Sequence, residues 1–317
     1  MVVLLAGILE FFAADLRCVS YPASIMRRVV DWTEKKLYAE QAPASRQVWA
    51  GTVAAVSVLA AVYNVVTWPK VLLYYETPVY IRYVAEAAVL AFTIGPCRSA
   101  RAAMAVQQAV QCGQRQRARY YAERLAGGDT ALPAEADPVR VTMTRVAKNT
   151  VDSIVSPLFF FVLLGLPGAV VYRVVHMLAS RWGDKRQPYY RYFGRTAVRL
   201  EAILNYIPVR LTCIFLILAA FFASYDWRGA CYTARRTAFL SFAASDGGAE
   251  ATIAGALHRR SGEYSSDGET CGFRPVAAAS VSSWRPAHIT GAVHLMYGVY
   301  LIALVLTAVV VGASSWL

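Results

Sequence analysis

Six acidic residues lie in or beside apolar stretches of the chain, where a carboxylate could do chemistry. An acid at membrane depth is costly to bury, so it is a functional candidate by default. The alternative is a structural carboxylate that pairs with an arginine. That alternative fits equally well for Glu86, with Arg82 on the same helical face, and for Glu201, with Arg199 or Arg195. The six acids are Asp15, Glu86, Asp129, Asp152, Glu201 and Glu250.

Cysteines and histidines give no sign of a metal site. No two of the six cysteines form a CxxC pair, and no histidine shares a helix face with a second ligand at metal spacing. The sequence also lacks the glycine-rich phosphate motifs GxxxxGK[ST] and GxGxxG and the GxSxG nucleophile motif. We therefore predict no metal site and expect no cofactor from these motifs.

The composition is typical of an integral membrane protein. Of 317 residues, 57% are hydrophobic and 16% are charged, whereas soluble domains carry about 25% charged residues. The net charge of +12 would suggest nucleic acid in a soluble protein. Beside apolar spans, basic residues instead favour one membrane side and anionic lipid headgroups. We expect lipids as partners and exclude nucleic acid.

Several stretches are long and apolar enough to cross a bilayer, which takes about 20 residues. The first, near the N-terminus, is shorter than the others and contains Glu10. The predicted spans are about 1–14, 48–68, 78–96, 207–225 and 291–317.

A sixth apolar stretch, 151–175, is predicted to enter and leave the membrane on the same side. The run Gly165-Leu166-Pro167-Gly168 interrupts its helix, because proline removes a backbone donor and glycine permits a tight turn. A re-entrant hairpin here would place every basic link on one side and the segment 227–290 on the other. The basic links are 15–46, 98–150 and 176–206.

The fold class that follows is an all-α integral membrane protein. We predict about five transmembrane helices, one re-entrant helical hairpin and amphipathic surface helices, in a single domain over residues 1–317. The segment Arg98–Leu125 reads as one helix that is too polar to span, so we place it at the membrane surface or in a packed layer.

Several motifs in the same order resemble those of the CbiB/CobD family, the adenosylcobinamide-phosphate synthases of cobalamin biosynthesis. A sibling group, the AmpE-type inner-membrane proteins, is similar in the Pro208–Leu211 run. The motifs are Asn149-Thr150-Val151-Asp152-Ser153, then Gly165 with Pro167-Gly168, then Tyr190-Arg191-Tyr192-Phe193-Gly194, and finally Asn205-Tyr206-Ile207-Pro208-Val209-Arg210-Leu211.

This resemblance implies an enzyme that joins an aminopropanol-type amine to a carboxyl group of adenosylcobyric acid, using ATP and a divalent metal. Such chemistry implies acids for Mg²⁺ and donors for phosphate. Six polar residues match the family pattern. The catalytic candidates are Asn149, Asp152, Lys185 and Glu250, and the cofactor-binding candidates are Asn205 and Arg210.

Other polar positions depart from that pattern. The family has an acid where Lys148 stands, an asparagine at His176, an aspartate at Ala179 and paired aspartates at Glu201-Ala202. A lysine in place of an acid opposes a bound cation. Further departures fall at Tyr21, Arg27, Gly128-Asp129-Thr130 and Ala243-Ala244-Ser245.

Three interpretations remain open. The departures favour a non-catalytic family member, which serves as an accessory or structural subunit of a larger membrane complex with other membrane proteins as partners. The few lysines and many arginines fit an organellar complex, such as a respiratory complex of the mitochondrial inner membrane, rather than a bacterial inner membrane. The first alternative is an active synthase that uses Mg–ATP, and the second is an AmpE-like signalling protein.

Overall fold

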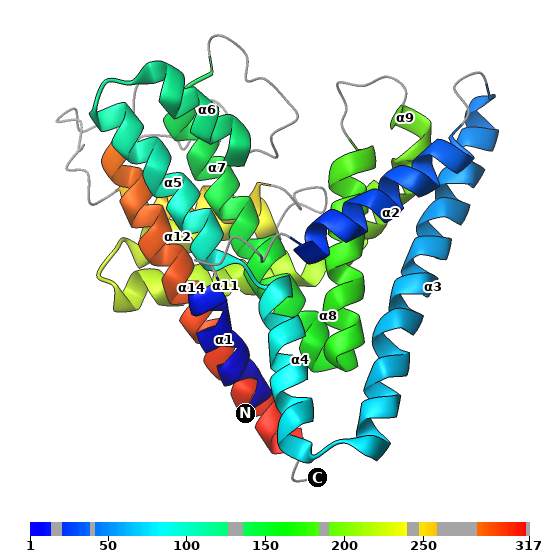
Figure 1. The fold of residues 1–317 in the computed structure, drawn as a ribbon. Helices are drawn as coiled ribbons and strands as arrows, with labels where there is room; N and C mark the ends of the chain where they lie inside the picture. Colours follow the sequence, from blue (N-terminus) through cyan, green and yellow to red (C-terminus); the bar gives the residue numbers. More distant parts are fainter. Residues whose placement is uncertain are drawn as a thin grey trace, which may run out of the picture. The chain divides into compact units, whose positions relative to one another are not determined.

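A computed structural model describes residues 1–13, 21–38, 42–125, 136–183, 190–239, 247–258 and 284–314. Every regular element in these ranges is helical, and no strand occurs among them, so the predicted all-α class is confirmed (Figure 1). The elements are α1 Val2–Ala13, α2 Tyr21–Leu37, α3 Ala44–Glu76, α4 Val79–Thr93, α5 Pro96–Gln111, α6 Arg115–Leu125, α7 Pro138–Thr150, a π-helical turn η2 Val151–Val155, α8 Ser156–Trp182, α9 Tyr190–Phe193, α10 Arg195–Leu204, α11 Tyr206–Phe222, α12 Trp227–Ala234, a π-helical turn η3 Arg235–Phe239, α13 Gly248–His258 and α14 Pro286–Ser314.

Four helical runs are long and apolar enough to cross a membrane, which agrees with an integral membrane protein. They are Ala44–Pro69, Val79–Gln111, Pro138–Trp182, which contains the non-helical Gly165, and Pro286–Ala313. A fifth results if α10 and α11 form one broken span. The predicted first span, 1–14, corresponds to the shorter α1, which has 12 residues. At about 1.5 Å per residue, a helix of this length does not cover the hydrocarbon core of about 30 Å.

The helices cluster into two compact units. Unit 1 contains Met1–Gly95, Ser156–Tyr206 and Leu304–Leu317, and unit 2 contains Pro96–Val155 and Ile207–Ala303. The single domain predicted for residues 1–317 stays a prediction.

Within unit 1, helix α8 folds back on itself at Gly165. This glycine has φ 67° and ψ −159°, a conformation that side-chain-bearing residues rarely adopt. The rings of Phe160 and Tyr172, from opposite sides of the break, stack with centroids 5.2 Å apart. Gly168 lies against the Phe160 carbonyl oxygen, which an added Cβ would approach to 2.6 Å. An uninterrupted helix would separate residues 160 and 172 by about 18 Å, so the chain forms the helical hairpin that the Gly-Leu-Pro-Gly run predicts.

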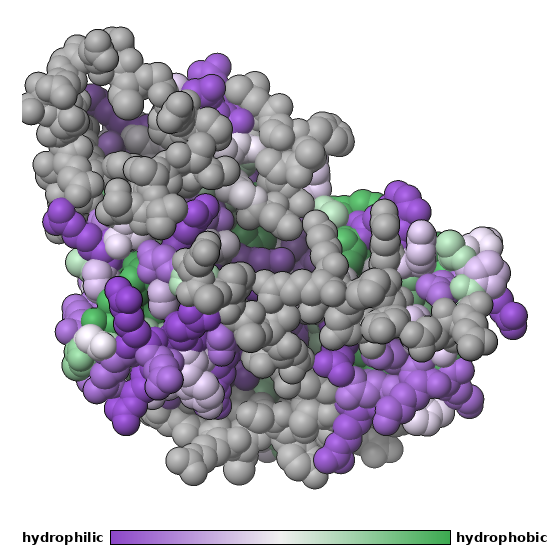
Figure 2. Space-filling model, turned by 90° about the horizontal axis from the view of Figure 1, so that it is seen from above, coloured by the Kyte–Doolittle hydropathy of each residue, from purple (hydrophilic) through white to green (hydrophobic). Residues whose placement is uncertain are grey.

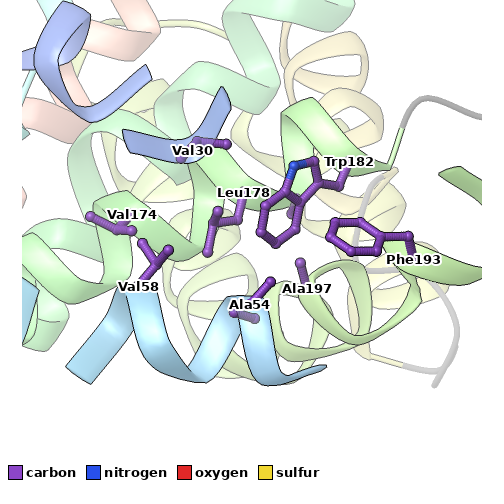
Figure 3. Close-up of a cluster of buried hydrophobic side chains, with 10 residues drawn as sticks. Val30, Ala54, Val58, Val174, Leu178, Trp182, Phe193 and Ala197 are labelled. Atoms are coloured by element: carbon purple, nitrogen blue, oxygen red, sulfur yellow. The ribbon is translucent and has the colours of Figure 1, made fainter. Parts of the chain in front are cut away.

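A cluster of buried apolar side chains holds the second arm of this hairpin against α3 (Figure 3). At its centre the fully buried Trp182 meets Phe193 edge to face, with ring centroids 4.9 Å apart. The backbones come unusually close here, because an added Cβ on Gly51 would overlap the Phe193 carbonyl oxygen and one on Gly194 would overlap that of Trp182. Small residues let membrane helices approach in this way.

In unit 2, the single helix predicted over 98–125 is wrong, because the chain breaks between α5 and α6. Gly113 has φ 71°, its N–H bonds the Val110 carbonyl, and the Gln114 N–H bonds the Ala109 carbonyl. This pair of bonds is the Schellman motif, which ends a helix at a left-handed glycine. On α6, Ala118 and Ala122 are buried while most of its arginines are exposed. Hydrophilic residues cover much of the described surface seen in Figure 2.

The segment 227–290, expected as a polar link, contains two packed helices in its described part. α12 and α13 approach closely at Gly229 and Gly255, where an added Cβ on Gly255 would lie 2.5 Å from the Gly229 carbonyl oxygen. Ala251, Ile253 and Ala256 of α13 are buried. The short apolar stretch of α13 was not predicted, because the segment 227–290 as a whole is polar and its charges nearly balance.

The close contact at Gly51 predicts a stability effect. Gly51→Ala should destabilise the protein by about 1–3 kcal/mol, because overpacking forces the α3 backbone away from Phe193. Thermal unfolding in mild detergent measures it. Gly312→Ala is the matched control, since nothing lies within 4 Å of an added Cβ there. Equal melting temperatures for the two variants would contradict the packing described.

Candidate functional site

Two polar bridges join α8 to α10 in unit 1, and we call them the unit 1 ladder. The Tyr172 hydroxyl donates to the Asn205 carbonyl oxygen Oδ1 at 2.8 Å, and His176 Nδ1 lies 2.7 Å from Glu201 Oε1. Tyr172 and His176 are four residues apart, as are Glu201 and Asn205, so each pair lies on one helical face. Numbers rise on α8 as they fall on α10, so the two helices run antiparallel.

The first rung of the ladder includes the other arm of the hairpin. The Ser156 hydroxyl also donates to Asn205 Oδ1, at 2.9 Å, so one amide oxygen joins residues from both sides of the Gly165 break. Asn205 is only 7% exposed, and its own backbone N–H bonds the Glu201 carbonyl at the end of α10. A buried amide held by two hydroxyls fixes both the hairpin and the helix end.

The second rung pairs a histidine with a carboxylate. The side chains of His176 and Glu201 are 18% and 15% exposed, so water screens the contact only in part. Arg199 or Arg195 was the predicted partner of Glu201. The structure gives His176 instead, and both arginines are exposed. Arg199 is two residues from Glu201 and so faces another side of α10.

Unit 2 holds a second polar set, on α5, α7 and α13. The Thr144 hydroxyl donates to Glu250 Oε1 at 2.8 Å, and the Asn149 amide donates to the Ser99 hydroxyl at 2.9 Å. Glu250 lies in the first turn of α13, where a negative charge is favoured by the helix dipole. Two of the predicted site residues are thus held by hydroxyl groups from neighbouring helices.

Asp152 lies in the π-helical turn η2, at 2% exposure. π-helical turns are rare and are often found at functional sites, since their extra residue redirects side chains. The retained acid therefore occupies an unusual backbone setting.

The predicted site residues are divided between the two units. Unit 2 contains Asn149, Asp152, Glu250 and Arg210, which is half-buried on α11, while Asn205 belongs to unit 1. Lys185 lies outside the described residues. The sequence did not identify Tyr172, His176, Ser156 and Thr144 as site residues. The four-residue spacing of Glu201 and Asn205 indicates that the two side chains share one face of a helix. That this face pairs with α8 can be seen only in the tertiary structure.

The departures from the family pattern do not share one environment. Ala179, where the family has aspartate, is 4% exposed and belongs to the apolar cluster of unit 1. Lys148 lies in the last turn of α7, which continues directly into η2. His176 and Glu201, by contrast, contact each other directly. Gly128-Asp129-Thr130 and Ala243-Ala244-Ser245 lie outside the described residues, and so do the side chains of Tyr21 and Arg27.

The shared amide at Asn205 predicts a specific loss of stability. Asn205→Leu should cost about 2–5 kcal/mol, because it takes this acceptor from the hydroxyls of Ser156 and Tyr172. Asn205→Asp keeps an acceptor oxygen and should cost less. Thermal unfolding in detergent measures both. Asn64→Leu is the control, since Asn64 is exposed and bonds only its own helix in the structure. A loss at Asn205 no larger than at Asn64 would refute the shared-acceptor role.

Comparison with known proteins agrees with these motifs. The cobalamin biosynthesis protein CobD of Klebsiella pneumoniae is 37% identical over 163 residues, which is 51% of each chain. That of Yersinia enterocolitica is 33% identical over 217 residues, 68% of this chain and 67% of the relative. That of Chromobacterium violaceum is 32% identical over 204 residues, 63% of each. The alignments thus span about half to two thirds of these relatives.

These relatives come from bacteria, so they lend no support to the predicted preference for a mitochondrial membrane. No solved structure matches this chain. The family model described as CobD/Cbib protein matches residues 3–296, which is most of the sequence. The chain therefore belongs to the CobD/CbiB family.

Proposed function

We propose that this protein is an active membrane enzyme of cobalamin biosynthesis, which forms an amide between an aminopropanol-type amine and a carboxyl group of adenosylcobyric acid. The curated relatives are named as cobalamin biosynthesis proteins, and the family match extends over most of the chain. This proposal reverses the preference drawn from the sequence, which read the departures from the family pattern as loss of the reaction.

The contact between His176 and Glu201 carries the proposal. The resemblance places an asparagine at position 176 and an aspartate at position 201, and in this chain the histidine and glutamate found there meet at 2.7 Å. Independent decay of an unused site would not be expected to preserve a bridge between two partly buried positions. Polar groups inside membrane helices are costly to maintain, and apolar residues could replace a bridge that serves no purpose. The bridge between His176 and Glu201 therefore supports use of this face of α8 and α10.

The oxygen donors needed for the proposed chemistry are present in unit 2. Mg²⁺ prefers carboxylate and amide oxygens, which Asp152, Glu250 and Asn149 supply. Asp152 and Glu250 are separate candidate ligands for the ion, because Glu250 contacts Thr144, which lies eight residues or about 12 Å before Asp152 along the helical chain. The cation Arg210 would hold phosphate. Mg–ATP, when bound, supplies the leaving group that a carboxylate lacks. The Thr144 hydroxyl keeps the Glu250 carboxylate oriented before any ion arrives.

In unit 1, the proposed role of the ladder is to hold His176 and Glu201 in place and to accept a proton from the amine. The amine must lose a proton before it can attack a carbonyl carbon, and a histidine beside a carboxylate is a common general base. Tyr172 and Ser156 hold Asn205, which fixes the end of α10 and so the position of Glu201 one turn earlier.

A non-catalytic scaffold is the second candidate, and Ala179 favours it. Where the family has aspartate, this chain buries a methyl group beside Trp182 and Leu178. Lys148 points the same way, because a lysine has replaced an acid there. On this reading the protein is an accessory subunit of a larger membrane complex.

Turnover by the purified protein decides between the two candidates. The full chain in mild detergent should convert adenosylcobyric acid, amine and Mg–ATP to the amide, detected by mass spectrometry. Glu250→Gln should lower kcat/KM by about 10–100-fold, because it weakens an ion ligand. Glu123→Gln is the matched control, a half-buried acid of the same unit outside the family motifs, and should retain activity.

The enzymatic proposal would be overturned in favour of the scaffold by two results together. The purified protein would be folded but make no amide, and the protein extracted from its native membrane would be part of a large complex. Equal losses for Glu250→Gln and Glu123→Gln would leave the enzyme but refute the role given to Glu250.

A further inference from the structure

One face of helix α2, in unit 1, is both cationic and apolar, and we call it the α2 outer arc. At 100° per residue its five members fall within about 120° of the helix circumference. All five are exposed, with Trp32 at 61% and Val29 at 44%. The members are Arg28, Val29, Trp32, Lys35 and Lys36.

The rest of α2 is occupied within unit 1. Val30 and Thr33, on the opposite side, are 2% and 5% exposed. The two acids of the described part of the helix point elsewhere. Asp31 pairs with Arg181 at 3.4 Å, and Glu34 accepts a hydrogen bond from the Trp182 indole at 3.2 Å. The outer arc therefore carries three cations without an acid among its members.

The arc lies close to the start of a candidate membrane span. α2 ends at Leu37 and the span begins at Ala44, so the link between them is short. Val30 of α2 belongs to the same buried cluster as Ala54 and Val58 of α3, which lie 10 and 14 residues after the start of that span, so α2 packs directly against it (Figure 1). A cationic helix joined by a short link to the start of a span is typical of the depth where a bilayer meets water.

We propose that the α2 outer arc binds the headgroups of anionic phospholipids. Tryptophan prefers the boundary between headgroups and hydrocarbon, and lysine and arginine extend their charges from apolar stems toward phosphate. The Lys36 amine lies 4.8 Å from the centroid of the Trp32 ring, so the charge and the ring present one combined surface. An anionic headgroup above an acyl chain matches both the three cations and the apolar Trp32 and Val29.

The affinity for an anionic lipid should depend on the three cations together. Each lysine or arginine near an anionic surface contributes about 1 kcal/mol, so Arg28→Gln/Lys35→Gln/Lys36→Gln should weaken binding on the order of 100-fold. The full chain in a neutral detergent is titrated with phosphatidylglycerol whose acyl chains carry bromine, which quenches nearby indoles. The difference between wild type and Trp32→Phe isolates Trp32 among the seven tryptophans. Raising the salt concentration should weaken the binding.

Two controls keep this test specific. Brominated phosphatidylcholine, which has no net charge, should quench Trp32 only at much higher concentration. Arg115→Gln/Arg117→Gln/Arg124→Gln removes three exposed cations from α6 and should leave the quenching of Trp32 unchanged. Equal binding of the two lipids, or an equal loss from the α6 variant, would overturn the proposal. A Trp32 that neither lipid quenches would also overturn it, since the arc would then face water or an acidic protein partner.

Discussion

The hydrogen bonds accepted by Asn205 connect three parts of unit 1 that are far apart in sequence. A polar side chain inside a helical membrane bundle needs a partner, because hydrocarbon offers none. One amide oxygen takes the hydroxyls of Ser156 and Tyr172, which lie on either side of the Gly165 break. The same residue ends α10, one turn after Glu201. The hairpin, the end of α10 and the bridge to His176 therefore depend on a single buried residue.

The sequence predicted most of the elements, because long apolar runs and a Gly-Leu-Pro-Gly interruption have direct backbone consequences. It did not predict the break at Gly113, which one glycine produces inside an otherwise helical pattern. It also missed α13, since the apolar stretch of this alanine-rich helix is too short to stand out in a polar segment. Asn149, Asp152, Asn205, Arg210 and Glu250 were found through a resemblance. Their partners Thr144, Ser156 and Tyr172 were not, because contacts between helices leave no spacing signal.

The four departures from the family pattern lie in different environments in the structure. Read along the chain, Lys148, His176, Ala179 and Glu201 look like successive losses. In the structure they separate into a helix-end lysine, an alanine in an apolar cluster and a bonded pair. A paired replacement has a different meaning from two single ones, because partners in contact depend on each other energetically. Membership of the CobD/CbiB family and this pair are the two observations on which the proposed enzymatic activity rests.

A double-mutant cycle tests most directly whether His176 and Glu201 depend on each other. It uses the residues that the family resemblance places at these two positions. Amide formation and thermal stability are measured for His176→Asn, for Glu201→Asp and for the double variant. If the two positions changed together to keep one bridge, each single variant loses activity, and the double variant recovers much of it, with a coupling energy of about 0.5–3 kcal/mol. Losses that simply add, with no recovery in the double variant, would contradict the account.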